Sequence, residues 1–522
     1  MTLNPGCSRR DALRVAATGT AWLAAPALRA HTPLATPSGV LQIVGPWEIG
    51  GLAPARSGHV FTRMQIVETL MNAHDDGTPQ PGLAARWELS ADALLWRFHL
   101  RPTARFHDGT PVLANAVLRC LNAARVAPAL LSAAPIAAID ADGPHTVRIR
   151  LSAPYGGLPA LLAHSSTLVL APSSYDTQGR VRAIVGSGPY RIARLAAPQQ
   201  VEAEAFTDYD GPRPAIQQVR YVAAGRSETR ALMAEGGQAD LAYGLDAASL
   251  ARLRRRPQLR VETVTLPRTI MLKLNAGLPA LQDVRVRRAL SLAIDRAGIA
   301  KALLRDPALA ATQLLPPTLP AWHSATLAPL RHDPAAAQAL LAQAGWQRGA
   351  DGLRDARGQA LTLSLRTFPD RPELPLVATA LQEQFRQAGI AVQVNVGNSG
   401  EIPLGHRDGT LQLGLAARNY ASVPDPVGTL LQDFGPQGGD WGAMGWHSDA
   451  AVAALRELAR GGATSERSAA LRAQVLAVLQ DELPIIPIAW YRQQVAASPR
   501  VQGVTLDPLE RSYRLTDLRW KA

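Results

Sequence analysis

The sequence predicts an α/β protein with more than one lobe, and three observations carry that prediction. With 522 residues, the chain is too long for a single compact core. Its 47% hydrophobic and 18% charged residues are typical of a globular protein rather than a disordered one. From residue 40 onward, short apolar strands alternate with amphipathic helices, an order that builds layers of helix on sheet.

Strands are predicted where apolar residues cluster or alternate over a few positions. Residues 41–44 form a short apolar run, and residues 95–100 and 146–151 alternate as a half-buried strand does. Residues 390–396 alternate directly after Gly389, which gives the order helix, glycine, strand.

Helices are predicted where apolar residues recur at helical spacing. Four segments show that spacing, namely residues 60–71, 283–304, 334–344 and 376–388. Gly345 and Gly389 follow the last two and are expected to terminate them. Asp283 stands where it can cap the first turn of the second helix.

The first 30 residues have the pattern of an export signal. The pair Arg9 and Arg10 precedes an apolar run over residues 15–28, with small residues at Ala27 and Ala30. Paired arginines indicate the twin-arginine export route. We therefore expect a periplasmic protein whose signal peptide is cleaved near Ala27 or Ala30.

Charge and cysteine content exclude other classes of protein. The formal net charge is +12, of which residues 1–30 carry +3, and most other arginines are scattered along the chain. We therefore expect no nucleic-acid partner. Cys7 is removed with the signal, which leaves Cys120 alone as a buried small hydrophobic residue without a disulfide partner.

No stretch of the chain carries a recognisable catalytic or metal-binding motif. The nucleophile elbow, the H-E-x-x-H motif, the phosphate-binding loop and the dinucleotide-binding glycine triplet are all missing. The eleven histidines are dispersed without metal-ligand spacing. The sequence therefore predicts no catalytic residue, no metal site and no cofactor.

One stretch, residues 105–111 (RFHDGTP), places His107 directly before Asp108 and so invites comparison with a catalytic pair. The dipeptide Asp108-Gly109 favours a tight turn, because glycine accepts a positive φ without steric cost. A local side-chain hydrogen bond of His107 in this turn is the favoured interpretation, and a proton shuttle is the alternative.

Five patterns in series resemble the peptide/nickel/opine class of extracellular solute-binding proteins, which feed ABC importers. They lie in order along the chain at residues 77–118, 186–190 (GSGPY), 283–299 (DVRVRRALSLAIDRAGI), 423–426 (VPDP) and 483–491 (LPIIPIAWY). Together they span most of residues 40–500.

This resemblance implies a two-lobed, periplasmic-binding-protein-like fold of type II, with the ligand enclosed between lobes that close by a hinge motion. The first lobe would comprise residues 38–60, 185–268 and 488–522, with residues 61–184 as an inserted subdomain. Residues 269–487 would form the second lobe. The implied partners are a small-molecule or peptide ligand and the transmembrane permease of an ABC importer, and the protein is expected to be a monomer.

The resemblance also implies where the ligand binds, although this chain departs from the family's pattern. Ser165 occupies the position at which nickel-chelate-binding members carry an arginine that clamps a carboxylate. Asn419 is the nearest match to the aspartate with which peptide-binding members hold the α-amino group of the peptide. Arg418 is a candidate for a forked contact with a ligand carboxylate. The full set of candidate ligand-binding residues is Arg56, Ser57, His164, Ser165, Arg418, Asn419, Tyr420 and Trp441.

Three functions are compatible with these observations. The first is a periplasmic receptor that captures a peptide-like, carboxylated or metal-chelate solute for an ABC importer. The second is a secreted hydrolase that uses His107 and Asp108, and the third is a chaperone-like binder with apolar contacts. The receptor hypothesis predicts that Arg418→Ala weakens ligand affinity, whereas the hydrolase hypothesis predicts that His107→Ala abolishes turnover.

Overall fold

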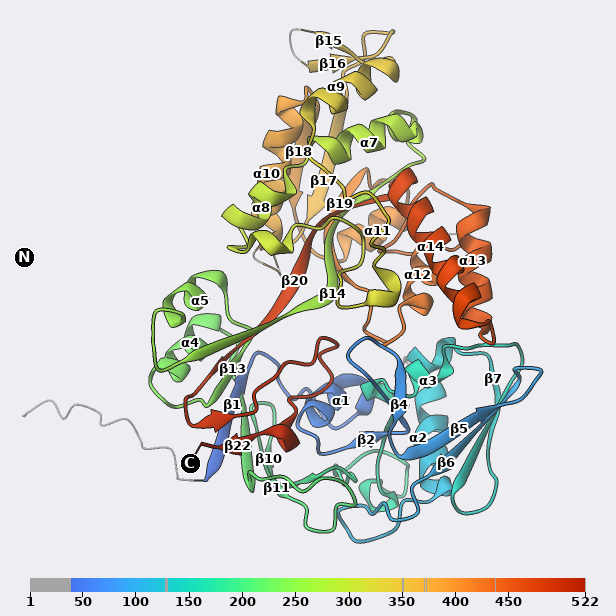
Figure 1. Cartoon of the computed structure of the whole chain (residues 1–522), viewed down its shortest axis with the longest axis vertical. Helices are drawn as coiled ribbons and strands as arrows, with labels where there is room; N and C mark the ends of the chain where they lie inside the picture. The colour runs from blue at the N-terminus through green and yellow to red at the C-terminus, as the bar shows by residue number, and fades with distance from the viewer. Residues whose placement is uncertain are drawn as a thin grey trace, which may run out of the picture.

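The protein consists of two lobes that share one continuous sheet (Figure 1). This computed structural model describes residues 39–521 except 127–129, 350–351, 370, 372 and 437. Ten strands follow each other in the order β10-β11-β12-β1-β13-β20-β14-β19-β17-β18. Their bounds are β1 Val40–Gly45, β10 Tyr190–Ala196, β11 Gln200–Ala205, β12 Gln218–Ala223, β13 Leu241–Tyr243, β14 Arg260–Leu274, β17 Thr362–Thr367, β18 Ala391–Val396, β19 Leu413–Asn419 and β20 Ile485–Ala497.

Strands β14 and β20 connect the two lobes. We call the part on the β13 side the first lobe and the part on the β19 side the second lobe. The pairing of β14 with β20 shifts register between Leu266 and Thr269. Pro267 lies at this shift and has no N–H for the ladder. The two long strands therefore cross from lobe to lobe at an irregular point, which lies beside the predicted boundary at residues 268 and 269.

The first lobe carries an additional four-stranded antiparallel sheet, in the order β5-β6-β8-β7. Its strands are β5 Ala84–Leu89, β6 Leu95–Leu100, β7 Ile136–Ala141 and β8 Thr146–Leu151, so the strands predicted at residues 95–100 and 146–151 are confirmed, as is the one at 390–396 (β18). Helix α2 (Ala114–Val126) packs on this sheet and carries Cys120, which is buried and not in a disulfide. The core of this sheet is continuous with that of β1, since Phe98 and Val147 belong to the same buried cluster as Leu41 and Ile43.

The helices predicted over residues 334–344 and 376–388 are confirmed as α9 (Pro334–Gln343) and α10 (Glu373–Gln387). Helices α4 (Ser227–Glu235) and α5 (Ala247–Leu253) pack on the first lobe. The second lobe contains helices α6 to α14, among them α6 (Pro279–Gln282), α11 (Glu401–Arg407) and α12 (Val427–Phe434). Gly345 and Gly389 have φ values of +88° and +86° after α9 and α10, which confirms them as helix terminators. Asp283 accepts a hydrogen bond from the N–H of Arg285, which confirms its role as a cap.

The helix predicted over residues 60–71 is wrong. Helix α1 covers Pro54–Arg63, and the chain then turns into two short strands, β2 (Glu68–Thr69) and β3 (Met71–Ala73). Gln65 has a φ of +53°, which ends the helix. A Cβ on Gly188 would lie 2.1 Å from the carbonyl oxygen of Gln65, so this turn is set by a segment far along the chain.

The long helix predicted over residues 283–304 is two helices, α7 (Val284–Ala293) and α8 (Arg296–Ala302). Ile294 is extended, and the carboxylate of Asp295 caps α8 by accepting from the N–H of Gly298 at 2.8 Å. The apolar spacing continued through this break, which is why periodicity alone did not reveal it.

In the described part of the chain, no helix combines the length and the apolar character needed to span a bilayer. The predicted export signal, residues 1–30, lies outside the described residues.

Candidate functional site: the cleft between the lobes

A cleft of about 1210 Å³ lies between the two lobes. The first lobe supplies the end of α1, the segment 67–82, His164 with its neighbours, and the C-terminal loop 507–517. The second lobe supplies Asn419, Ser422 and Pro424, and Arg268 contributes from the lobe crossing. A cavity of this size accommodates a short peptide or a small chelate.

The lobes also touch directly at points away from the strands that join them. The backbone N–H of Gly156 in the first lobe donates to the carbonyl of Ala459 in the second, at 2.6 Å. A Cβ on Gly77 would lie 2.3 Å from the carbonyl oxygen of Pro424. Backbone therefore meets backbone across the lobes at both places.

Three of the eight predicted ligand-binding residues line the cleft, namely His164, Ser165 and Asn419. His164 caps a short turn, with its Nδ1 accepting from the backbone N–H of Ser166. The side chain of Asn419 accepts from the N–H of Ala421 at 3.0 Å. The motif comparison thus located one stretch on each wall of the cleft.

Two predicted residues in α1 do not line the cleft. Arg56 is exposed at the start of the helix. Ser57 is fully buried, and its hydroxyl has no hydrogen-bond partner among the described residues. The residues of α1 that line the cleft are His59, Thr62 and Arg63, farther along the helix.

The guanidinium of Arg418 makes a forked contact, but with a carboxylate of the protein itself. Its Nε and Nη2 lie 2.7 and 2.8 Å from the two carboxylate oxygens of Asp433. Asp433 is 1% exposed, and burial raises the pKa of its carboxyl, which Arg418 opposes. Arg418 is not among the residues that line the cleft.

The two aromatic residues of the predicted ligand-binding set, Tyr420 and Trp441, also lie outside the cleft. Tyr420 is fully buried, and its hydroxyl contacts the Met271 sulfur at 3.3 Å. Trp441 packs edge-on against Phe368, at 6.2 Å between ring centroids, at the margin of the second-lobe core. Neither ring lines the cleft. Tyr420 directly follows Asn419, and successive side chains of an extended segment point to opposite sides.

The C-terminal loop 507–517 is a cleft wall that the sequence analysis missed. The buried Asp507 carboxylate accepts from three backbone N–H groups, at Leu509, Arg511 and Ser512. These hydrogen bonds fix the conformation of the loop. The only local sign of this loop in the sequence is the turn-forming pair Asp507-Pro508.

Backbone strain concentrates on this cleft. Among the described residues, six non-glycine residues have positive φ, and three of them line the cleft: Gln65, Glu510 and Arg514. The Gln65 amide makes a reciprocal pair of hydrogen bonds with Thr516, at 3.1 and 3.2 Å. Residues held in this conformation by their surroundings are characteristic of binding sites.

Five arginines line the cleft, and four of them face carboxylates. Arg101 contacts Glu68 at 3.0 Å and Asp210 at 3.1 Å. The remaining paired arginines meet their partners as follows: Arg268 with Glu510 at 2.8 Å, Arg511 with Asp507 at 3.4 Å, and Arg514 with Asp75. The fifth is Arg63.

His59 and His164 bring two neutral imidazoles to the same wall. Burial lowers the pKa of each to about 4, and Arg63 contributes to the shift of His59. A Cβ on Gly58 would lie 2.4 Å from the carbonyl oxygen of Ser165, so glycine at this position lets α1 approach the His164 turn closely. Neutral imidazole is a metal ligand, although no group of three or more His, Cys, Asp or Glu side chains suited to a metal occurs among the described residues.

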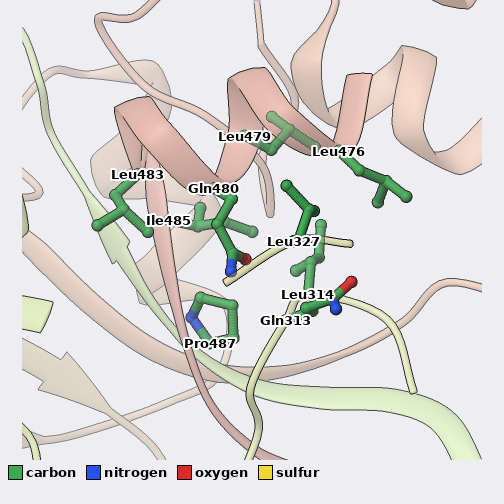
Figure 2. A pocket seen from close by; sticks show the side chains of 9 residues that line it. All are labelled: Gln313, Leu314, Leu327, Leu476, Leu479, Gln480, Leu483, Ile485 and Pro487. Carbon is green, nitrogen blue, oxygen red and sulfur yellow. The ribbon is translucent and has the colours of Figure 1, made fainter. Parts of the chain in front are cut away.

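A second cavity lies inside the second lobe and is far smaller, about 10 Å³. Figure 2 shows it between the end of α14 (Ser465–Glu482), with Leu479 and Gln480, and the strand residues Ile485 and Pro487. Its volume is that of about one water molecule, and its walls are mostly leucine side chains. It is a packing defect of the core rather than a ligand site.

His107 and Asp108 do not form a pair. The Nε2 of His107 lies 3.0 Å from the carbonyl oxygen of Gly188, and burial lowers the pKa of the imidazole to about 4. Asp108 instead accepts from Thr110 and Ser173. Gly109 has a φ of +82°, which confirms the turn. The histidine therefore ties the turn to a distant segment, not to its neighbour as expected.

Comparison with known families decides the class of the protein. Residues 78–441 match the model of the bacterial extracellular solute-binding proteins, family 5. This chain belongs to that family. Members of the family are periplasmic binding proteins that work with ABC permeases, and the chain is accordingly a solute-binding protein of an ABC importer and not an enzyme.

Individual relatives and structures agree with this assignment. The chain is 27% identical over 481 residues to the nickel-binding periplasmic protein of Escherichia coli, covering 89% of this chain and 91% of that one. It is 26% identical over 328 residues to the glutathione-binding protein GsiB of Shigella flexneri, covering 61% of each.

Solved structures show the same two-lobed fold. NikA from Brucella suis, in complex with Fe(III)-EDTA, superposes with a TM-score of 0.83 at 24% identity, covering 92% of this chain and 100% of that one. DppA from Helicobacter pylori, in complex with the peptide STSA, gives a TM-score of 0.71 at 21% identity, covering 93% and 98%.

Proposed function

We propose that this protein captures a peptide-like, carboxylated or metal-chelate solute in the cleft between its lobes and delivers it to an ABC permease. The observation that carries the proposal is the cleft of about 1210 Å³, whose walls come from both lobes. A ligand between lobes that share a hinge stabilises the closed form, and the closed form is what a permease can distinguish.

The ligand class follows from what the walls offer. Five guanidinium groups make the walls basic; four of them face carboxylates of the protein, which leaves Arg63 as the donor for a ligand oxyanion. His59 and His164 provide neutral nitrogens that can complete the coordination of a metal already held by a chelator. The named relatives and structures bind nickel, Fe(III)-EDTA, glutathione or a peptide, which is the same range of solutes.

Within the cleft we assign ligand contact to His164, Ser165 and Asn419, which face it from both lobes. Ser165 contributes a hydroxyl rather than the family's arginine, so the charge that holds an anionic ligand comes from elsewhere on the wall.

The test is a binding screen by isothermal titration with four probes: Fe(III)-EDTA, nickel with L-histidine, glutathione, and the peptide STSA. At least one probe is expected to bind the wild-type protein with a dissociation constant below about 100 μM, or about 5.5 kcal/mol. Ser165→Trp, which places a bulky indole in the cleft beside His164, should weaken that binding about tenfold or more. Failure of all four probes would reject this ligand class.

The export and assembly of the protein belong to the same proposal. We propose cleavage of a twin-arginine signal near Ala27 or Ala30, release into the periplasm and action as a monomer. The intact mass of the periplasmic protein identifies the cleavage position, and size-exclusion chromatography with light scattering gives the assembly state.

A further inference from the structure

Arg63, the last residue of α1, is a buried cation at the wall of the cleft. Only 8% of the residue is exposed, yet it is among the residues that line the cavity. A guanidinium keeps its charge in proteins. Burial of such a charge is costly unless an opposite charge or a full set of acceptors accompanies it.

The contacts of Arg63 are incomplete. Its Nε donates to the backbone carbonyl of Glu510 at 2.7 Å, and its guanidinium carbon lies 4.0 Å from the centre of the Trp47 ring. Among the described residues, its two terminal nitrogens make no hydrogen bond, and Nη1 is buried in that state. Because Nη1 is enclosed by protein, Nη2 is the terminal nitrogen that a carboxylate in the cleft can reach.

Arg63 differs from the other arginines of the cleft in its lack of a carboxylate partner among the described residues. Each of the other four cleft arginines has a carboxylate within 4.0 Å. Arg63 has none among the described residues, and the nearby Glu510 carboxylate is already paired with Arg268. The imidazole of His59, on the same helix, is neutral near pH 7 and adds no negative charge.

We propose that Arg63 is the anion anchor of the cleft and that the ligand carries a carboxylate which accepts from its Nη2. This inference rests on the proposed function and sharpens it by naming the group that the ligand must possess. It also explains how a cleft with Ser165 in place of an arginine still holds an anionic solute. The carboxylate can belong to a chelator, to glutathione or to a peptide C-terminus, which offer the same chemistry.

The melting temperature of the ligand-free protein distinguishes an anion-binding role of Arg63 from a purely structural one. If the residue mainly held α1 to Trp47 and Glu510, its removal would lower the melting temperature. If it is a buried charge awaiting an anion, Arg63→Met preserves the packing of the side-chain stem and removes an uncompensated charge. The melting temperature of the ligand-free Arg63→Met protein should then equal or exceed that of the wild type.

The experiment measures affinity and melting temperature for wild type, Arg63→Met, Arg63→Lys and the control Arg226→Met. Arg226 is exposed at the start of α4, and its replacement should change neither quantity. The probes are Fe(III)-EDTA, glutathione, STSA, and STSA with a C-terminal amide. A comparison of the two forms of STSA shows whether binding requires the peptide carboxylate, and Fe(III)-EDTA tests the carboxylates of a chelator.

For the carboxylate probe that binds the wild type, Arg63→Met should weaken affinity about 10- to 100-fold, as expected for loss of a charge-assisted hydrogen bond. Arg63→Lys, which keeps the charge but not the guanidinium geometry, should have an affinity between those of the wild type and Arg63→Met. Unchanged affinity in Arg63→Met would overturn the inference while the proposed function stood.

If Arg63→Met melts at a lower temperature than the wild type, and Arg63→Lys binds the probe with unchanged affinity, then Arg63 has a structural role. That result would also overturn the inference. If the wild type binds none of the probes, the proposed ligand class fails and this inference fails with it.

Discussion

Gly156 and Ala459 join the two lobes through a single backbone hydrogen bond of 2.6 Å. Ala459 lies in the last turn of α13 (Asp449–Arg460), where carbonyl groups lack intrahelical donors. The first lobe therefore completes the end of a second-lobe helix. A Cβ on Gly156 would lie 2.6 Å from the Cα of Gly461, so the contact requires glycine.

Gly156→Ala should therefore push the lobes apart. Because the obstructing atoms are backbone, relief requires separation of the lobes rather than rotation of a side chain. We expect a larger radius of gyration by small-angle X-ray scattering and a ligand affinity about tenfold weaker. The weaker affinity corresponds to a loss of about 1.4 kcal/mol in the free energy of binding, because the closed form becomes less favourable. Gly225→Ala is the matched control, since a Cβ there meets nothing within 4 Å. Equal radii for both variants would show that this contact does not govern closure.

Arg418→Ala should primarily destabilise the second lobe. Removing the guanidinium leaves the 1%-exposed carboxylate of Asp433 buried without its main partner. Breaking a buried pair in this way costs about 3 kcal/mol, far more than loss of an exposed pair. Chemical denaturation measures the free energy of unfolding, and replacing both residues (Arg418→Met with Asp433→Leu) should recover much of the loss. A cost below about 1 kcal/mol would contradict the assignment of Arg418 to this internal pair.

The pH dependence of stability should report His107. Its pKa is about 4 in the folded protein, mainly through burial, and about 6.5 in an unfolded chain. The unfolded state therefore binds more protons between these values, so the free energy of unfolding falls as pH drops from about 6.5 towards 4. His107→Gln, which retains a donor for the carbonyl of Gly188, should reduce this fall by about 2 kcal/mol. Denaturation curves at pH 7 and pH 4.5 provide the measurement, and parallel losses in both proteins would contradict it.

The fold was largely predictable wherever local chemistry decides the structure. The turn at Asp108-Gly109, the cap at Asp283 and the strand at residues 95–100 depend on neighbours in sequence, and all three are confirmed. The break between α7 and α8 was not predictable, because Ile294 continues the apolar stripe while its backbone is extended. The end of α1 was missed because Gln65 takes its conformation beneath Gly186 and Gly188, more than a hundred residues later.

The candidate site was predictable only in part, for the same reason. His164, Ser165 and Asn419 lie in stretches that resemble a known family, and they do line the cleft. Arg63 looks like an ordinary charge at the end of a helix, and its significance arises from Glu510, which is 447 residues away. Likewise, the residues next to Arg418 in the sequence do not predict that Asp433 is its partner. We therefore expected Arg418 to make a forked contact with a ligand, whereas it makes this contact with Asp433.

Native mass spectrometry of the protein purified from the periplasm tests the central claim most directly. If the cleft captures a solute, the wild-type protein should carry a small molecule that is released on unfolding. The same molecule should be depleted in Ser165→Trp, whose indole enters the cleft beside His164, and in Arg63→Met. A wild-type protein of polypeptide mass alone that also ignores every probe, or a ligand retained fully by Ser165→Trp, would contradict capture between the lobes.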